Sequence, residues 1–422
     1  MGFNNPYFNE IREERLELID SIEINNTIYL SYVLHSKDTL ICPKCQSTQI
    51  IKYGKGTRKL KARILAHFKT NISVEVSKFK CNRCSTYFYD HFEDVETNCN
   101  ISKNTILSVL QDLRSDLTIK YVAQKNSIDE KTVINIFEKY INIERLTLPS
   151  TICVDEFKNL KNEKGKYAFV IYSPTTQEIV DILPNRQQDK LIKYFSEIDY
   201  QERASVKYFI QDMNSSYFTI AKQFFPNATI VVDSFHYIEC ITKAFGDIRL
   251  RIQEKIKENR TKYNMLKKNW RLLTKQTRNI PLCEIYNYMR RRKTSPSNYL
   301  NDALSISEEL AMAYDTLQDF YVEWENVKLE TADEFMDRWI NIFENHICEE
   351  YHGVASTFKH WRNEIINSFI RFGDKRLSNG PIEGINNKIK AIKKISYGYK
   401  NFELMRSRIM YIINKKINCK KI

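Results

Sequence analysis

Two pairs of cysteines, each with the spacing C-x-x-C, restrict the fold of the N-terminal part of this chain more than any other feature. The tight turn between two such cysteines directs both thiolates at one tetrahedral metal ion, usually Zn²⁺. Between the pairs, apolar and polar residues alternate as in short β-strands. The pattern predicts a zinc ribbon with a structural Zn²⁺, and two unrelated thiol turns are the alternative. The expected ligands are Cys42, Cys45, Cys81 and Cys84.

The chain carries an excess of positive charge. Its 422 residues include 65 Lys and Arg against 52 Asp and Glu, which gives a formal net charge of +13. A soluble protein with this excess usually binds a polyanion, most often nucleic acid. A general preference of the genome for lysine is the alternative explanation.

Neither a membrane span nor a secretory signal is expected. No run of 18 apolar residues occurs, and the first residues lack the basic and apolar regions of a signal peptide. We therefore expect a cytoplasmic protein whose remaining cysteines are reduced thiols.

The first 95 residues hold a predicted helix and a basic cluster. Apolar side chains at Ile11, Leu16 and Ile19 have helical spacing, so a helix is expected within residues 1–35. In the ribbon, a cluster of Lys and Arg with few acids suits contacts with DNA phosphates, and a solvated basic face is the alternative. The candidate DNA contacts there are Arg58, Lys59 and Arg63.

Residues 118–140 have the pattern of two short helices separated by a tight turn. The small Ala123 permits a close helix crossing, and Ser127 or Asp129 can cap the second helix. This predicts a helix-turn-helix, although the usual turn glycine is absent and an ordinary helical hairpin is the alternative. The second helix would present three residues to base edges: Lys131, Thr132 and Asn135.

From Thr151 the pattern changes to short apolar runs interrupted by two helical segments. Its order, β-β-β-α-β-α-β, predicts a sheet that begins antiparallel and ends parallel, an α/β core of ribonuclease H type. The expected strands are 151–157, 167–173, 178–183, 206–213 and 228–233, and the expected helices are 188–198 and 217–225.

Acidic residues end two of these strands. Asp155 ends the first and Asp212 the fourth, and ligands gather near strand ends in such sheets. A later helix that begins near Asn379 has a buried apolar stripe with Glu383 beside it, so it can dock on the sheet and direct Glu383 at both Asp residues. Three such carboxylates suit two Mg²⁺ (or Mn²⁺) ions, which support phosphodiester hydrolysis and transesterification. Asp residues that merely cap strands, with a solvated Glu383, are the alternative. The polar flank of the helix would meet DNA through Asn386, Asn387, Lys390 and Lys394.

The order of these parts resembles transposases of the ISL3 insertion-sequence family. The similar pieces are the cysteine pairs, the helix-turn-helix, the acidic strand ends and, most specifically, residues 379–390. The resemblance implies a DDE transposase in which the same three carboxylates form the metal-binding triad. Asp233 and His236 also fit a D-x-x-H motif of related DDE families. We expect His236 to position a water or the scissile phosphate, and a hydrogen-bonded histidine that opens a helix is the alternative.

The whole chain divides into four expected domains. They are a zinc-ribbon domain (1–95), a helix-turn-helix domain (96–148), a ribonuclease H-like core (149–236 and 374–422) and an all-helical insertion (237–373). Together they predict a bacterial, nucleoid-associated transposase that binds terminal inverted repeats of double-stranded DNA. It would act as a homodimer or higher assembly and catalyse strand cleavage and transfer. A DNA-binding regulator derived from a transposase, or a nuclease that cuts without joining, is the alternative.

Overall fold

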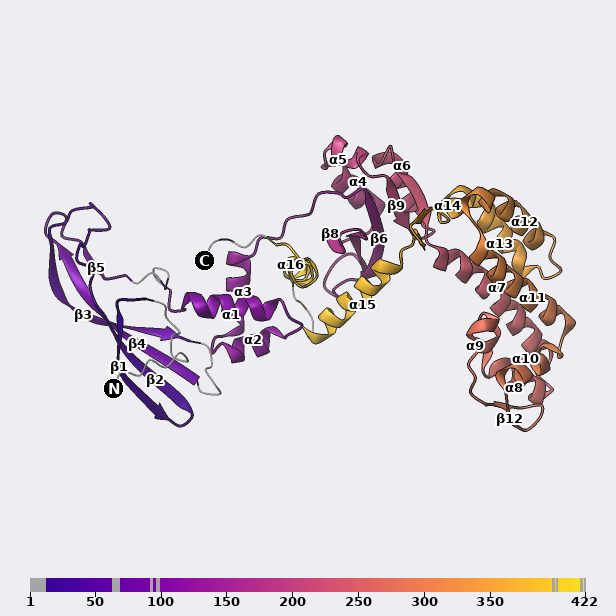
Figure 1. Cartoon of the computed structure of the whole chain (residues 1–422), viewed down its shortest axis with the longest axis horizontal. Coiled ribbons are helices and arrows are strands. Elements are labelled where there is room, and N and C mark those ends of the chain that lie inside the picture. The colour runs from indigo at the N-terminus through magenta and orange to yellow at the C-terminus, as the bar shows by residue number, and fades with distance from the viewer. Residues whose placement is uncertain are drawn as a thin grey trace. The chain divides into compact units, whose positions relative to one another are not determined.

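The structure, a computed structural model, forms two compact units. One unit combines Met1–Arg145 with Lys388–Ile422, and the other is Leu146–Asn387. The boundary between them falls within helix α15 (Gly380–Ile395) (Figure 1). The described residues are 13–62, 69–91, 94–95, 99–396, 399, 401–417 and 420.

A five-stranded sheet occupies the N-terminal part of the first unit. Its order is β1-β2-β4-β3, and the short β5 pairs with the second half of β4. Apolar side chains from β2, β3 and β4 form its core. The strands are β1 (Leu16–Ile24), β2 (Thr27–Leu34), β3 (Ile50–Lys61), β4 (Lys69–Cys81) and β5 (Tyr87–Tyr89).

The helix predicted near the N-terminus is wrong, because β1 and β2 form a hairpin there. Asn25 and Asn26 connect the strands with positive φ angles of 47° and 61°. Positive φ at both central residues is the geometry of a type I′ turn, which asparagine tolerates better than most residues. Leu16 and Ile19 therefore lie in β1, and Ile11 lies outside the described residues.

Three short helices and the C-terminal helix share the second core of the first unit. Val122 and Ala123 of α2 pack in one apolar cluster with Val133 and Ile136 of α3, and Tyr411 of α16 joins them. Asp129 caps α3 by accepting the backbone N–H of Thr132. These helices are α1 (Lys103–Leu113), α2 (Ile119–Lys125), α3 (Glu130–Tyr140) and α16 (Phe402–Ile413).

The second unit begins with a mixed five-stranded sheet of order β10-β9-β6-β7-β8. The pairs β10–β9 and β9–β6 are parallel, and the pairs β6–β7 and β7–β8 are antiparallel, as the sequence predicted. The bounds are β6 (Thr151–Lys158), β7 (Tyr167–Ser173), β8 (Glu178–Leu183), β9 (Tyr208–Gln211), β10 (Thr229–Val232), α4 (Gln188–Ser196), α5 (Tyr200–Ala204) and α6 (Ser215–Phe224).

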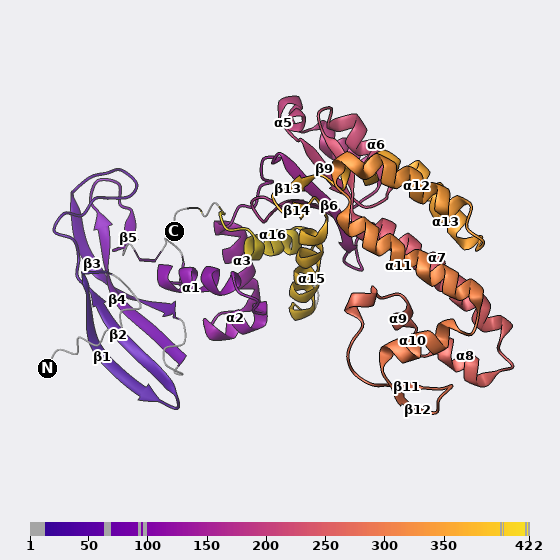
Figure 2. The same cartoon turned by 45° about the vertical axis from the view of Figure 1, so that its right-hand side comes forward.

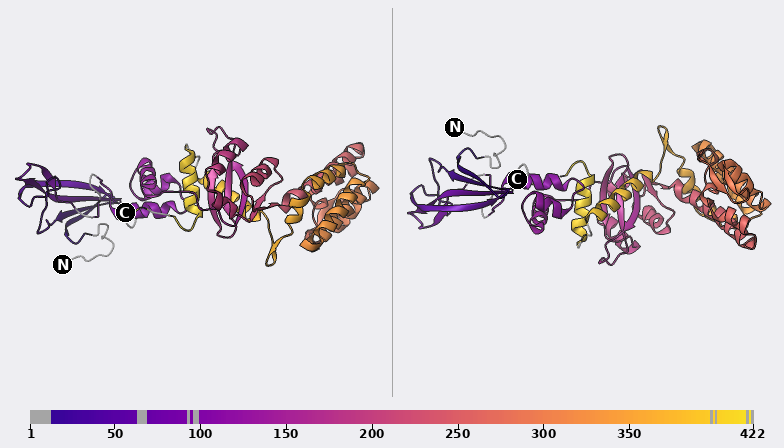
Figure 3. Two further views of the ribbon diagram at one scale, coloured as in Figure 1. Left: turned by 90° about the horizontal axis from the view of Figure 1, so that it is seen from above. Right: turned by 90° about the horizontal axis from the view of Figure 1, so that it is seen from below.

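The two faces of this sheet have different coverings. Ile152 and Val154 of β6 point into an apolar cluster formed with α4 and α6. Because side chains alternate along a strand, Cys153 and Asp155 point to the opposite face. There the segment that leads into α15 lies 3.9 Å from the Cys153 sulfur, at the carbonyl oxygen of Ser378. Figures 1 and 3 show α15 in gold, and its first half, residues 380–387, belongs to the same unit as the sheet.

Helices dominate the rest of the second unit, and the long α7 and α11 run beside each other within one apolar core (Figure 2). The helices are α7 (Ser234–Lys255), α8 (Arg260–Lys267), α9 (Trp270–Leu273), α10 (Pro296–Leu304), α11 (Glu308–Asn326), α12 (Ala332–Glu344), α13 (Glu350–His360) and α14 (Arg362–Asn367).

The predicted all-helical insertion (237–373) is wrong in detail, since it contains one small hairpin and the first strand of a second. Buried Asn287 accepts the N–H groups of Met289 and Arg290, and Arg291 has a φ of 51°. Together these features reverse the chain and end the helical pattern. The hairpins are β11 (Ile285–Asn287) with β12 (Arg292–Thr294), and β13 (Arg371–Phe372) with β14 (Lys375–Arg376).

Among the helices of the described chain, none is long and apolar enough to cross a membrane.

Candidate active site and metal centre

The four predicted cysteines form one group in the first unit. Their sulfur atoms all lie within 4.8 Å of one another, and the Cys42–Cys84 and Cys45–Cys81 sulfurs are each 3.6 Å apart. Two sulfurs bound at ~2.3 Å to a tetrahedral Zn²⁺ lie ~3.8 Å apart, so the group fits a zinc ion.

The two cysteine turns have the same local structure. The residue after the second cysteine of each pair, Gln46 or Ser85, has a left-handed φ, of 55° and 53° respectively. The N–H of the first cysteine donates to the chain a few residues later in both turns. Hydrogen bonds with Thr86 lower the pKa of Cys84 to about 6 without any metal. The pKa of Cys45 moves the other way: a backbone hydrogen bond at Ser47 lowers it, but burial and hydrogen bonds with the other three cysteines raise it to about 12. Within this one group, Cys84 is therefore favoured as the thiolate and Cys45 as the thiol.

A second group of titratable side chains lies at the carboxyl ends of the parallel strands in the second unit. Asp155 lies in β6, and Asp212 and Asp233 directly follow β9 and β10. The alternation of side chains places all three on the face opposite α4 and α6, because Phe209 and Ile230 belong to the cluster on that other side.

Helix α7 adds a histidine to this group. His236 lies in its first turn, with Nε2 at 2.8 Å from Asp212 Oδ1. This contact raises the pKa of His236 and favours the imidazolium form. The structure thus joins the predicted D-x-x-H pair to the predicted catalytic Asp212.

Two asparagines connect the region of α15 to these acids. Asn379 donates from its backbone N–H to Asp233 (3.1 Å) and from Nδ2 to both the Val154 carbonyl (3.0 Å) and Asp212 Oδ1 (3.3 Å). Asn386 donates from Nδ2 to Asp155 Oδ2 at 2.5 Å. Both asparagines are buried, and among the described residues the Oδ1 atom of each has no hydrogen-bond partner. These contacts fix the start of α15 against the acidic face of the sheet.

The acids occupy a site that disfavours their charges. Burial, followed by repulsion from Asp212, raises the pKa of Asp155 from 3.8 to about 7. Burial also raises the pKa of Asp233, although the Asn379 N–H opposes that rise. A site with this excess of oxygen donors and negative charge suits a hard divalent cation.

Glu383 is exposed, and it does not close a compact set of ligands with Asp155 and Asp212. Among the described residues, one group of three or more potential metal ligands has all its ligand atoms within 4.8 Å of one another, and that group is the four cysteines. Asp155, Asp212 and Glu383 do not form such a group. Glu383 precedes Asn386 by three positions, and residues with this spacing are neighbours on a helix.

The candidate DNA contacts differ in their exposure. Asn386 is buried against Asp155 and therefore does not face an external ligand. Arg58 is half-buried and donates to the Cys99 carbonyl at 2.6 Å, and Thr132 donates to Asp129. Arg63 lies outside the described residues. The exposed candidates are Lys59, Lys131, Asn135, Asn387, Lys390 and Lys394.

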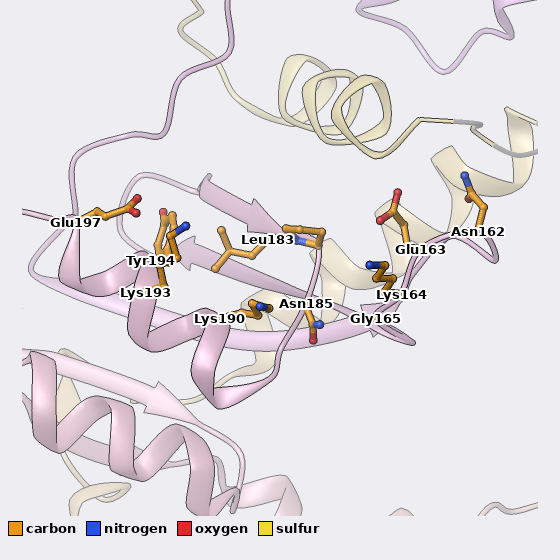
Figure 4. Close-up of a pocket in the computed structure, with 11 residues that line it drawn as sticks. Asn162, Glu163, Lys164, Gly165, Leu183, Asn185, Lys190, Lys193, Tyr194 and Glu197 are labelled. Carbon is orange, nitrogen blue, oxygen red and sulfur yellow. The ribbon is translucent and has the colours of Figure 1, made fainter.

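A cavity of about 530 Å³ between β8, α4 and the loop after β6 lies apart from these acids (Figure 4). Gly165 is required there, because a Cβ atom would come within 2.7 Å of the Pro184 carbonyl. None of the lining residues is a predicted site residue. We assign it no role in the chemistry.

Comparison with known proteins identifies the family. The model of the ISL3-type DDE transposases, described as "Transposase", matches residues 152–409. The chain belongs to this ISL3 transposase family. A curated relative, the transposase for insertion sequence element IS1001 of Bordetella parapertussis, is 22% identical over 265 residues. That match covers 60% of this chain and 58% of the relative, so the chain spans little more than half of the relative's length.

The ISL3 match encloses the acidic group but not the four cysteines or helices α1–α3. Within it, the sequence indicated the acids and His236 but missed two contacts. Asn379 was interpreted only as the place where the helix begins, and Asn386 only as a DNA contact. The sequence features that could have revealed these contacts are the asparagine directly before α15, Asn379, and the asparagine beside the buried apolar stripe of that helix, Asn386.

Proposed function

We propose that this ISL3 family member binds the terminal inverted repeats of an insertion sequence, cleaves the DNA strands at its ends and joins them to a target. One observation carries the proposal. Asp155 and Asp212 share one face of the sheet at the ends of adjacent parallel strands, and asparagines flanking Glu383 fix α15 to both of them. We interpret the core as a ribonuclease H-type fold.

The residues present fit a divalent metal, Mg²⁺ or Mn²⁺. Asp155 and Asp212 offer hard oxygen ligands, and burial with mutual repulsion leaves Asp155 short of compensating positive charge. We propose Glu383, the acid of α15 that is exposed three positions before Asn386, as the third ligand of the triad. When bound, two such ions would activate the attacking oxygen and stabilise the leaving oxygen of the phosphodiester.

The chain's own groups would orient this triad. His236 Nε2 and Asn379 Nδ2 both contact the same oxygen, Asp212 Oδ1, and so restrict the rotation of this carboxylate. Because the pKa of His236 is raised by Asp212, the imidazolium can also donate to a phosphate oxygen. Asn386 fixes Asp155 in the same way and acts as a positioning residue rather than a DNA contact.

The first unit would supply recognition of the inverted repeats. Helices α2 and α3 meet at a turn in which Ser127, with a φ of 54°, takes the place of the usual glycine. If α2 and α3 form a helix-turn-helix, Lys131 and Asn135 are exposed on its recognition helix. The cysteine group would hold a structural Zn²⁺. Two DNA ends require at least two copies of the chain, so we propose a homodimer or higher assembly.

Cleavage of labelled DNA that carries the element's terminal repeats tests this proposal. With Mg²⁺, the wild type should nick the repeat ends and Asp212→Asn should lose the activity by more than ~10³-fold while still binding the repeats. Asp374→Asn, an exposed Asp in the same unit, is the control and should cleave normally. Repeat binding without cleavage by the wild type would favour a regulator, and cleavage without joined products would favour a nuclease.

A further inference from the structure

Three tyrosines and two lysines form a built surface on the sheet of the first unit. Lys78 and Lys80 of β4 lie directly across from Tyr89 and Tyr87 of β5, and Tyr53 of β3 packs beside them. We call these five residues the tyrosine–lysine patch. The three tyrosines are between 46% and 55% exposed, so the patch is open to solvent.

The patch has a fixed arrangement. The Lys78 ammonium lies 5.6, 5.4 and 5.7 Å from the ring centroids of Tyr53, Tyr87 and Tyr89, and the rings of Tyr53 and Tyr87 meet edge to face at 4.8 Å. Gly56 leaves the space that Tyr89 occupies, since a Cβ atom at that position would come within 2.6 Å of the ring. The side chains are therefore preorganised at the surface.

The positive charge of the patch is not neutralised by the acids of the surrounding segment, residues 50–91. Residues 50–91 contain ten Lys or Arg but only two acids, Glu75 and Asp90. Glu75 pairs with Lys55 at 2.7 Å, and Asp90 pairs with Arg15 at 3.4 Å. Across the described part of the chain, no carboxylate forms an ion pair with Lys78 or Lys80.

We infer that the tyrosine–lysine patch contacts the phosphate backbone of duplex DNA, an inference that rests on the proposed function. Two ammonium groups and three phenol hydroxyls offer hydrogen-bond donors to phosphate oxygens. Lys78 lies over one face of each ring, which leaves at most the opposite face of each for stacking on an unpaired base. Direct base reading would then belong to other parts of the protein, and the patch would fix the position of the ribbon on DNA.

The salt dependence of DNA binding distinguishes direct phosphate contacts by the patch from a general electrostatic attraction between the basic protein and DNA. Fluorescence anisotropy would give the Kd of the full-length protein for a labelled terminal-repeat duplex over a series of salt concentrations. Lys80→Ala should reduce the slope of log K against log salt by ~0.9, and Lys78→Ala/Lys80→Ala by ~1.8, because each lysine contacts one phosphate. Lys52→Ala is the matched control: it removes one exposed lysine that lies opposite Phe79, on the other face of the same strands, and should leave the slope unchanged.

A second set of variants tests the hydroxyl groups. Tyr87→Phe keeps the ring and removes only the donor, so binding should weaken severalfold without a change of slope. Circular dichroism and the melting temperature show whether each variant remains folded.

The outcomes distinguish this inference from the proposed function. A wild type that binds no DNA overturns both. A wild type that binds, with slopes that are unchanged in Lys78→Ala/Lys80→Ala or reduced equally in Lys52→Ala, overturns only the patch. Tighter binding to the single strand than to the duplex, lost in Tyr87→Ala, would show that the patch stacks on bases instead.

Discussion

Replacement of Asp155 by Asn should stabilise the second unit at alkaline pH when no divalent metal is present. The pKa of Asp155 is raised from 3.8 to about 7, first by burial and then by Asp212, with a smaller repulsion from Glu156 and an opposing attraction from His236. A carboxyl group with a raised pKa destabilises the folded state once it ionises. This penalty is absent below pH 3.8, grows as the pH rises, and is complete above pH 7.

The magnitude follows from the shift. A rise of ~3 pKa units corresponds to ~4 kcal/mol. Asp155 is only partly buried and shares its titration with Asp212, so we halve this value and expect a gain of ~2 kcal/mol at pH 8. The side-chain amide introduced by Asp155→Asn can form hydrogen bonds through both its oxygen and its NH₂ group. Its oxygen replaces one carboxylate acceptor, and its NH₂ can donate to the unpaired Oδ1 of Asn386 after that side chain flips.

Urea unfolding followed by tryptophan fluorescence measures this gain. Asp155→Asn should raise the free energy of unfolding by ~2 kcal/mol at pH 8 and by less than half as much at pH 5. Asp374→Asn, at an exposed hairpin turn, should change neither value. No gain at pH 8, or an equal gain at both pH values, would refute the reasoning. The signal reports on the correct unit, because all four tryptophans lie in it: Trp270, Trp324, Trp339 and Trp361.

Three further predictions concern other parts of the chain. Cys42→Ser should lose bound zinc and melt the N-terminal sheet, and a zinc assay that still finds one ion per chain would contradict the four-cysteine site. Asp129→Ala should destabilise the first unit by ~1 kcal/mol in thermal unfolding, because it removes the cap of α3, whereas Asp129→Ser should retain most of the stability. Arg376→Lys should destabilise the second unit by ~1–3 kcal/mol in urea unfolding. Arg376 donates hydrogen bonds to three backbone carbonyls at the end of α11, and a lysine cannot reach all three. An unchanged urea midpoint would show that these contacts contribute little to stability.

The sheet of the second unit could be predicted from the sequence because each of its strands is marked by residues close together in the chain. Short apolar runs, the break at Pro174 and the break at Pro226 set the strands within a few residues of their observed bounds. Alternation then assigns Asp155 to one face without any further information.

The errors arose where a single residue conformation decided the structure. The periodicity of apolar residues around Leu16 fits a helix, but the left-handed Asn25 and Asn26 form a hairpin. Likewise, a buried Asn287 converts part of the expected insertion helix into a turn. Neither conformation can be read from hydrophobic spacing.

The contacts of α15 could not be predicted, because they join distant parts of the chain. Asn386 and Asp155 are 231 positions apart, and the register of a helix on a sheet across such a gap depends on everything between them. The sequence correctly placed a buried stripe on this helix, with Ile382 and Ile389 fully buried. It could not show which polar side chain beside the stripe would meet the acid.

The choice of asparagine at these contacts has a consequence for the metal. A lysine beside Asp155 would lower the pKa of that carboxyl and neutralise its charge, whereas the Asn386 amide donates a hydrogen bond and leaves the charge in place. The site therefore keeps an uncompensated charge in the metal-free state, which is the origin of the ~2 kcal/mol expected above. If Asp155 is a metal ligand, saturating Mg²⁺ should relieve this penalty in the wild type but not in Asp155→Asn. The stability advantage of the variant at pH 8 should then vanish, and an advantage that persists at saturating Mg²⁺ would mean that Asp155 does not contact the ion.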